Sequence, residues 1–131
     1  MTMTKLIIIS APSGAGKTTL CKRLLDEFPQ KLAVSISSTT RSPRGNEKDS
    51  DDYYFISKTE FENEIKNNNF AEWALVHGNY YGTSKLVIEK AFRAGKSLLL
   101  DIDVQGANTL YQNYNEKCIR FFISPPSLDE L

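Results

Sequence analysis

The stretch from residue 5 to residue 28 constrains the fold more than any other part of this 131-residue chain. It begins with an isoleucine-rich apolar run, KLIIIS, continues through a glycine-bearing loop, and ends with leucines at helical spacing between Lys17 and Phe28. A short apolar run of this kind is typical of a strand that is covered on both faces, as in a parallel sheet. The order strand, loop, helix therefore predicts an α/β fold.

Further apolar runs predict the remaining strands of the core. They lie at residues 32–36, at 97–101 (SLLLD) and at 118–123 (CIRFFI). Between the last two runs, residues 104–114 are predicted to form the crossover helix that parallel neighbours need. The length predicts one domain, which buries roughly two-thirds of its unfolded surface.

Residues 37–83 have a different, mixed polar composition. They contain strand candidates at 53–56 and 71–77 and a helix at 59–67, which Thr59 and Glu62 begin with capping-box spacing. A second helix over 84–94 ends at Gly95. We interpret 37–83 as a mixed α/β subdomain inserted into a core made of residues 1–36 and 84–131.

The charge balance and the N-terminus exclude several classes of protein. Sixteen basic residues balance sixteen acidic ones, so the chain lacks the basic field of a protein that binds nucleic acid through its phosphates. The first apolar run, Leu6–Ile9, is too short for a membrane span or a secretory leader. Cys21 and Cys118 have no metal-type spacing, so we expect reduced thiols and a cytoplasmic location.

Residues 11–18, APSGAGKT, differ from the phosphate-loop pattern G-x-x-x-x-G-K-[ST] only at the first glycine. Gly14 and Gly16 let successive backbone N–H groups point at a β-phosphate, and the start of the helix adds its positive dipole. Lys17 supplies a charge for the β- and γ-phosphates, and Thr18 offers a hydroxyl to Mg²⁺. The predicted nucleotide-binding residues are Ala11, Pro12, Ser13, Gly14, Ala15, Gly16, Lys17 and Thr18. The alternative is a glycine-rich turn with an accidental lysine.

Two acids follow a buried strand. Asp101 comes after three leucines, so its carboxylate emerges at the carboxyl end of the strand, where open α/β sheets bind their ligands. A phosphate loop commonly works with such an acid, which holds Mg²⁺ directly or through water. For both Asp101 and Asp103, the alternative is an acid that caps the following turn.

The inserted region carries a candidate site for a phosphate monoester. Arg41 and Arg44 flank Pro43 in a stiff loop, and Tyr53 and Tyr81 add two phenols. Tyr81 lies in a predicted turn at residues 78–84, GNYYGTS. Arginine forks match phosphate oxygens with two hydrogen bonds. The alternative is a pair of solvated surface arginines.

Five strings in order along nearly the whole chain resemble guanylate kinases, which transfer a phosphoryl group from ATP to GMP. They are SAPSGAGKT, SISSTTRSPR, EWALVHGNYYGTS, LDIDVQGA and FISPPS. The resemblance implies an enzyme with the P-loop nucleoside monophosphate kinase fold, in which a parallel-sheet core carries an inserted mixed α/β GMP-binding subdomain. It further implies ATP and GMP as substrates, dGMP as a second acceptor, Mg²⁺ as cofactor, and neither nucleic acid nor a membrane as partner.

The resemblance assigns roles residue by residue. It implies that Lys17, Arg41 and Asp101 are catalytic, and that Thr18 and Asp101, the latter through water, hold the metal. The residues that it implies for the GMP phosphate are Ser37, Arg41, Arg44, Tyr53 and Tyr81. Those that it implies for the guanine side are Glu72, Thr83, Asp103 and, with the loop around it, Ser37.

The chemistry of guanine agrees with that assignment. A carboxylate such as Glu72 can accept the N1–H and N2 amino donors of guanine together, while the hydroxyl of Thr83 can donate to O6. Adenine presents an unprotonated N1 to the same carboxylate, so a site of this kind can discriminate by about 10⁴-fold.

The chain also departs from the family. Asn46 and Ser50 replace expected glycines, which puts the geometry of that loop in question, and His77 lies at a variable position, where we expect a structural or surface histidine. Guanylate kinases continue past FISPPS with an arginine-rich lid, another core strand and a terminal helix, so we expect a C-terminally incomplete domain with an exposed edge at 118–123. The alternatives are a guanylate-kinase-like binding module for phosphorylated peptides and an inactive fragment that binds GMP. The oligomeric state stays open.

Overall fold

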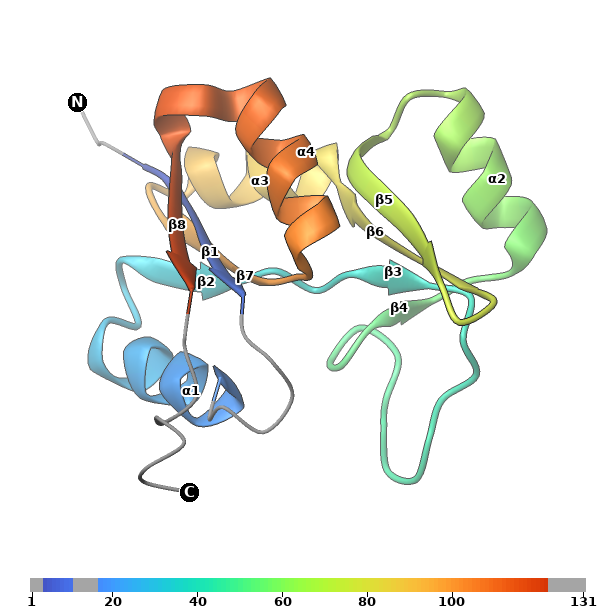
Figure 1. Cartoon of the computed structure of the whole chain (residues 1–131). Coiled ribbons are helices and arrows are strands. Elements are labelled where there is room, and N and C mark those ends of the chain that lie inside the picture. The colour runs from blue at the N-terminus through green and yellow to red at the C-terminus, as the bar shows by residue number, and fades with distance from the viewer. Residues whose placement is uncertain (1–3, 11–16, 123–131) are drawn as a thin grey trace, which may run out of the picture. The chain divides into compact units, whose positions relative to one another are not determined.

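The structure, a computed structural model, describes residues 4–10 and 17–122, without the side chains of Lys17, Thr18 and Phe122 (Figure 1). The chain divides into two compact units. We call Met1–Val34 together with Ala91–Leu131 the core unit, and Ser35–Lys90 the inserted unit. The region that the sequence predicts as an insertion, 37–83, lies within the inserted unit.

The core unit contains a four-stranded sheet in the order β2-β7-β1-β8. Its strands are β1 (Leu6–Ser10), β2 (Leu32–Val34), β7 (Ser97–Asp101) and β8 (Cys118–Phe122), and every pairing is parallel. The predicted parallel sheet is therefore confirmed, although β2 ends at Val34 and not at residue 36. Within the described residues β8 is an edge strand, as the sequence predicts.

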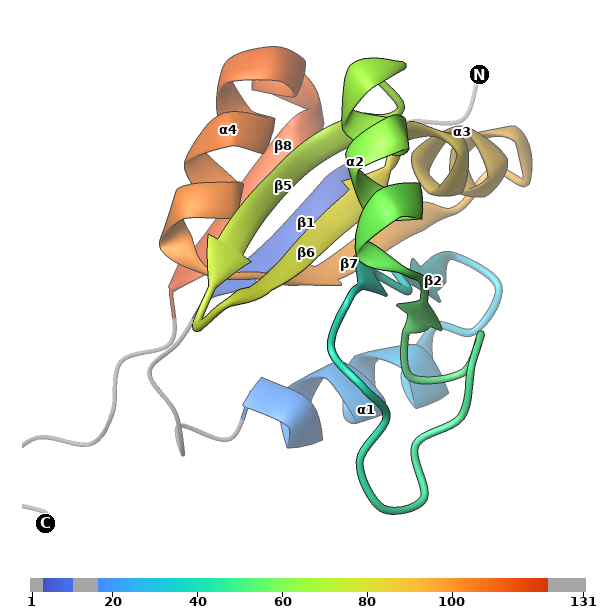
Figure 2. The ribbon, with the colours of Figure 1, turned by 90° about the vertical axis from the view of Figure 1, so that its right-hand side faces the viewer.

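Helices α1 (Lys17–Glu27) and α4 (Val104–Tyr114) lie on opposite sides of this sheet (Figures 1 and 2). Helix α1 packs Cys21, Leu24 and Leu25 against the strands. Leu20, which the spacing of leucines places on the same face, is 39% exposed because Cys21 takes that position. Helix α4 buries Gly106, Ala107 and Leu110 and leads through the short 3-10 helix η1 (Asn115–Lys117) into β8. Both cysteines are free thiols.

The inserted unit contains a second, mixed sheet in the order β4-β3-β6-β5. Its strands are β3 (Ser38–Thr39), β4 (Tyr54–Phe55), β5 (Phe70–Val76) and β6 (Asn79–Ser84). Strands β3 and β4 are parallel, whereas β6 pairs antiparallel with both β3 and β5. Helix α2 (Lys58–Lys66) precedes β5, and α3 (Lys85–Arg93) follows β6. Gly95, with a φ of +73°, ends α3 as predicted.

Two local predictions for the inserted unit are wrong. Helix α2 is capped by Ser57 and Glu60, whose side chains exchange hydrogen bonds with each other's backbone N–H at 3.1 and 3.5 Å, and not by Thr59 and Glu62. Residues 79–84 form strand β6 and not a turn. The turn itself is His77–Gly78, where both φ angles are positive, at +51° and +82°, as two-residue hairpin turns of type I′ require. His77 is exposed there, as expected of a surface histidine.

Three aromatic rings form the core of the inserted unit. Phe61 of α2 is fully buried and stacks on Phe70 and Tyr80, with ring centroids 4.3 and 4.8 Å away. Gly82 of β6 lies against these rings: a Cβ atom there would come within 2.9 Å of Phe70 and 3.0 Å of Phe61. The glycine of the sequence motif is therefore needed for packing, because any side chain would push the rings apart.

Candidate functional site

Strand β6 separates the aromatic core from a polar face. Successive side chains of a strand point to opposite faces. Tyr80 packs on Phe61, so Tyr81 and Thr83 project from the opposite face of the sheet. The register pairs Thr83 with Glu72 of β5, which brings two of the predicted guanine-side residues to the same place.

Glu72 and Thr83 form a buried hydrogen-bonded pair. The Thr83 hydroxyl donates to Glu72 Oε1 at 2.7 Å. Thr83 is 0% exposed and Glu72 is 6% exposed. A buried carboxylate is costly unless it is hydrogen-bonded, and a threonine hydroxyl has only one proton to give. The Glu72 carboxylate is therefore held by the Thr83 hydroxyl at a position that is largely shielded from water.

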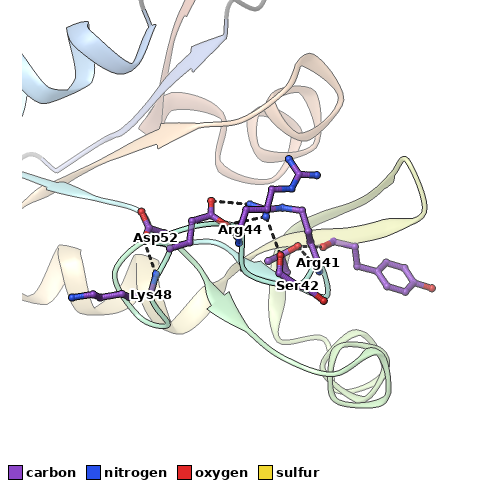
Figure 3. A network of polar contacts seen from close by, with 8 residues as sticks. Arg41, Ser42, Arg44, Lys48 and Asp52 are labelled. Atoms are coloured by element: carbon purple, nitrogen blue, oxygen red, sulfur yellow. Dashed lines mark hydrogen bonds and ion pairs between the residues drawn. The ribbon is translucent and has the colours of Figure 1, made fainter.

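Arg41 gathers the predicted phosphate-binding residues. Its Nη1 and Nη2 atoms donate to the two carboxylate oxygens of Glu47 at 2.9 and 3.0 Å, and Nη1 also donates to the Ser42 carbonyl at 3.0 Å (Figure 3). The guanidinium lies over the Tyr53 ring, 5.1 Å from its centroid, and the rings of Tyr53 and Tyr81 meet edge to face at 6.1 Å. These neighbours, Glu47 above all, raise the pKa of Arg41 although its burial opposes the charge.

Two residues that hold Arg41 are not among those predicted from the sequence. The first is Glu47, whose Oε1 also accepts the backbone N–H of Arg44 at 2.8 Å. Arg41 first and Arg44 second lower the pKa of Glu47. The second is Thr39, which is fully buried; its hydroxyl donates to the Tyr80 carbonyl at 2.8 Å and accepts the Arg41 N–H at 3.2 Å. The only sequence signal for Glu47 is its place three residues after Arg44, in a turn that its own N–H closes on the Arg44 carbonyl.

Arg44 and Ser37, two further residues predicted for the phosphate, have no described side-chain hydrogen bond to this cluster. Arg44 is exposed, and it contributes its N–H to Glu47. The carbonyl of Ser37 accepts the N–H of Tyr54 at 2.9 Å, which connects the segments of β3 and β4. The roles of their side chains toward GMP stay predictions.

The loop between Arg44 and Tyr53 replaces its expected glycines in two different ways. Gly45 takes the left-handed conformation with a φ of +53°, so Asn46 does not need it. Ser50 has a φ of +71°, a strained conformation for a serine, while its N–H donates to the Tyr53 carbonyl at 2.8 Å. The loop therefore has the left-handed conformation at position 50 without the glycine expected there, at an energetic cost.

In the core unit, Asp101 lies beside the end of β1. The register places Asp101 opposite Ile9, and the neighbouring Ser10 hydroxyl donates to the Ile102 carbonyl at 3.1 Å. Asp101 thus lies at the carboxyl end of the inner strands, where the chain leaves β1 and enters the predicted phosphate loop. Residues 11–16 of that loop lie outside the described residues, as do the side chains of Lys17 and Thr18, which begin α1.

Asp103 has a structural role in the same unit. It is the N-cap of α4, and its Oδ1 accepts the Gly106 N–H at 2.8 Å. The capping interpretation that the sequence left open therefore applies to Asp103, and its role toward guanine stays a prediction.

Other features of the described residues do not add to the site. Among residues 4–10 and 17–122, no group of three or more His, Cys, Asp or Glu side chains could hold a metal ion. No helix in this same part of the chain is long and apolar enough to cross a membrane. The inserted unit has a groove of about 510 Å³ between parts of α2 and α3, whose lining includes Glu60, Glu64, Leu86 and Lys90 but none of the residues predicted to bind GMP.

Comparison with known proteins gives one consistent result. The family model described as guanylate kinase matches residues 3–131. A guanylate kinase of Geobacter metallireducens is 55% identical over 126 residues, which are 96% of this chain and 61% of that protein. One from Porphyromonas gingivalis is 45% identical over 130 residues, 98% of this chain and 69% of that protein.

A solved structure agrees with the sequence comparison. The crystal structure of guanylate kinase from Anaplasma phagocytophilum has a TM-score of 0.81 at 34% identity, covering 99% of this chain and 64% of that one. The chain thus spans about 61% of the length of the Geobacter relative, and the matched part includes both units described above.

Proposed function

Because the chain belongs to the guanylate kinase family, we propose that the protein transfers the γ-phosphoryl group of ATP to GMP and releases ADP and GDP. The observation that carries this proposal is the buried Glu72–Thr83 pair, which lies in the same unit as the Arg41 cluster. The pair offers hydrogen-bonding groups for a guanine base, and the Arg41 cluster offers a positive charge for a phosphate. We include dGMP as an acceptor because the base and the phosphate, for which these residues are proposed, are common to GMP and dGMP.

Guanine recognition follows from the number of protons on the pair. Thr83 gives its only proton to Glu72 at present. When guanine enters, its N1–H and N2 amino group can both donate to Glu72, which releases the Thr83 proton for O6. Every polar group is then paired, whereas adenine would leave the buried carboxylate facing an unprotonated nitrogen.

The acceptor phosphate would lie against Arg41, Tyr53 and Tyr81. A guanidinium in a partly buried site forms stronger hydrogen bonds to phosphate oxygens than it does in water, and two phenol hydroxyls can donate further bonds. The side chains of Ser37 and Arg44 complete this part of the proposal. Transfer requires an oxygen of this phosphate to attack the γ-phosphorus of ATP in line, and it needs no covalent nucleophile.

The donor side rests on the core unit. Backbone N–H groups of residues 11–16 and the amine of Lys17 would hold the ATP phosphates. Oxygen donors suit Mg²⁺, and the Thr18 hydroxyl and the Asp101 carboxylate, the latter through water, would hold it with the nucleotide. The bound ion neutralises charge on the phosphates. With both thiols free, we also propose a cytoplasmic location.

A coupled assay of ADP formation with GMP, dGMP, AMP, CMP and UMP tests the proposal. We expect GMP to exceed AMP by orders of magnitude in kcat/KM. Lys17→Ala should abolish transfer and leave GMP binding nearly intact, since the lysine serves the donor phosphates. Equal rates with AMP and GMP would refute the proposal, and GMP binding by the wild type without any GDP formation would favour a binding module.

A further inference from the structure

We propose that Glu47 is a positioning residue for the acceptor phosphate: it holds Arg41 by one edge and thereby presents the other edge of the guanidinium to GMP. This inference rests on the proposed function. Glu47 would not touch GMP itself, and its effect would pass through Arg41.

The hydrogen bonds of Arg41 define which edge of its guanidinium can face a phosphate. A guanidinium has five N–H groups. The Nη1 atom gives one proton to Glu47 and one to the Ser42 carbonyl, and Nη2 gives one to Glu47. The N–H groups that these three bonds do not use, one on Nη2 and one on Nε, form the second fork of the same group, and the side chains of Tyr53 and Tyr81 also hydrogen-bond to this guanidinium. A fork of this kind matches two oxygens of a phosphate.

Glu47 also fixes the loop from which both arginines come. Its carboxylate accepts the backbone N–H of Arg44 at 2.8 Å, while its own N–H donates to the Arg44 carbonyl at 2.9 Å. The Glu47 side chain therefore ties the guanidinium of Arg41 to the backbone of Arg44. The backbone N–H of Arg41 donates to the Thr39 hydroxyl. Arg41 is therefore fixed at its backbone by Thr39 and at its guanidinium by Glu47.

A carboxylate near a phosphate could instead weaken binding by repulsion. The exposures of the two side chains decide between these effects. The Arg41 side chain is 9% exposed, whereas that of Glu47 is 26% exposed. Solvent screens the field of Glu47 toward a phosphate, but the orientation that it imposes on the buried guanidinium is not screened. Positioning therefore outweighs repulsion, and loss of Glu47 should weaken GMP binding.

The test compares GMP with guanosine, which has the base and sugar but no phosphate. Glu47→Gln keeps the size of the side chain and turns one acceptor into a donor that faces Arg41. We expect it to weaken GMP about tenfold, or about 1.4 kcal/mol, and to change guanosine affinity by less than about twofold. Asp51→Asn is the matched control. Asp51 is an exposed acid in the same loop, and its side chain has no hydrogen bond to any described residue. It should leave both affinities unchanged.

Repeating the Glu47→Gln change in an Arg41→Lys variant distinguishes a positioning role of Glu47 from a general loss of structure. In Arg41→Lys the fork is absent, so adding Glu47→Gln should weaken GMP by less than about twofold. If Glu47→Gln does not fold, Glu47→Asp replaces it. This change keeps the charge but withdraws the carboxylate by one methylene group, and it should also lower GMP affinity relative to guanosine.

Three results would overturn the inference. Equal losses for GMP and guanosine would mean that Glu47 only supports the fold. Tighter GMP binding by Glu47→Gln would mean that Glu47 competes with the phosphate. A wild-type protein that binds GMP no better than AMP would refute the proposed function and this inference with it, whereas the first two results leave the proposed function intact.

Discussion

The hydrogen bond between Thr83 and Glu72 allows a quantitative prediction for the unliganded protein. Thr83→Val keeps the shape of the side chain and removes only the hydroxyl. Hydrogen bonds to charged groups contribute about 1.5–3 kcal/mol. Because Thr83 is 0% exposed, water cannot take over its role. We therefore expect Thr83→Val to lower the free energy of unfolding by about 2 kcal/mol.

A double-mutant cycle isolates this bond from the other contacts of the two residues. Glu72→Met removes the carboxylate at similar length, and each single change breaks the Thr83–Glu72 hydrogen bond while it leaves one of the two polar groups of that bond in place. The double variant leaves neither, so its loss should be smaller than the sum of the single losses by about 1.5 kcal/mol or more. Thr83→Ser, which keeps the hydroxyl, is the control and should show a smaller loss than Thr83→Val.

The chain contains a suitable reporter for this measurement. Trp73, the only tryptophan, lies next to Glu72 on β5 and meets Tyr80 edge to face at 5.8 Å. Urea unfolding can therefore be followed by its fluorescence, and a loss of about 2 kcal/mol should move the midpoint by about 1 M. A coupling energy below about 0.5 kcal/mol would refute the reasoning, because contacts that do not interact add within that range.

Three further predictions concern the inserted unit. Gly82→Ala should destabilise it by about 1–3 kcal/mol, because the new methyl group would strike the rings of Phe70 and Phe61; an unchanged urea midpoint would contradict this. Ser50→Gly should raise the free energy of unfolding by about 0.5–1 kcal/mol by relieving a φ of +71°, and a lowered melting temperature would count against it. The pKa of Glu47 is lowered on folding, so its contribution to stability is present above its ordinary value of 4.5 and is lost as the pH falls through the folded value. Unfolding curves below pH 4.5 should accordingly depend less on pH in Glu47→Gln than in the wild type.

The elements of the core unit could be read from the sequence because each has a local signal. The buried parallel strands are continuous apolar runs, and β7 and α4 have the predicted bounds. The start of α2 could not be read in this way. Both Ser57 with Glu60 and Thr59 with Glu62 have capping-box spacing, and only the pair at the first turn of the helix forms the reciprocal bonds.

Strand β6 shows a different reason for a missed element. Its sequence, NYYGTS, has no apolar alternation, and it contains a glycine. It is a strand because β5 and β3 pair with it on either side and because Gly82 makes room for two rings. Its hydrogen bonds come from partners distant in sequence, which a local pattern does not contain.

The sequence was enough to predict the order of the elements in the core unit, the phosphate-loop motif, the family and the residue types that a GMP site needs. Which partners these residues take follows from the fold. Four acids lie between Arg44 and Tyr53 and look alike in the sequence, yet the turn brings only Glu47 to Arg41. Tyr80 and Tyr81 are neighbours, yet the pleat sends one into the core and the other to the polar face. Partner choice depends on register and turn geometry, because hydrogen bonds and ion pairs act over a few ångströms and sequence separation does not set that distance.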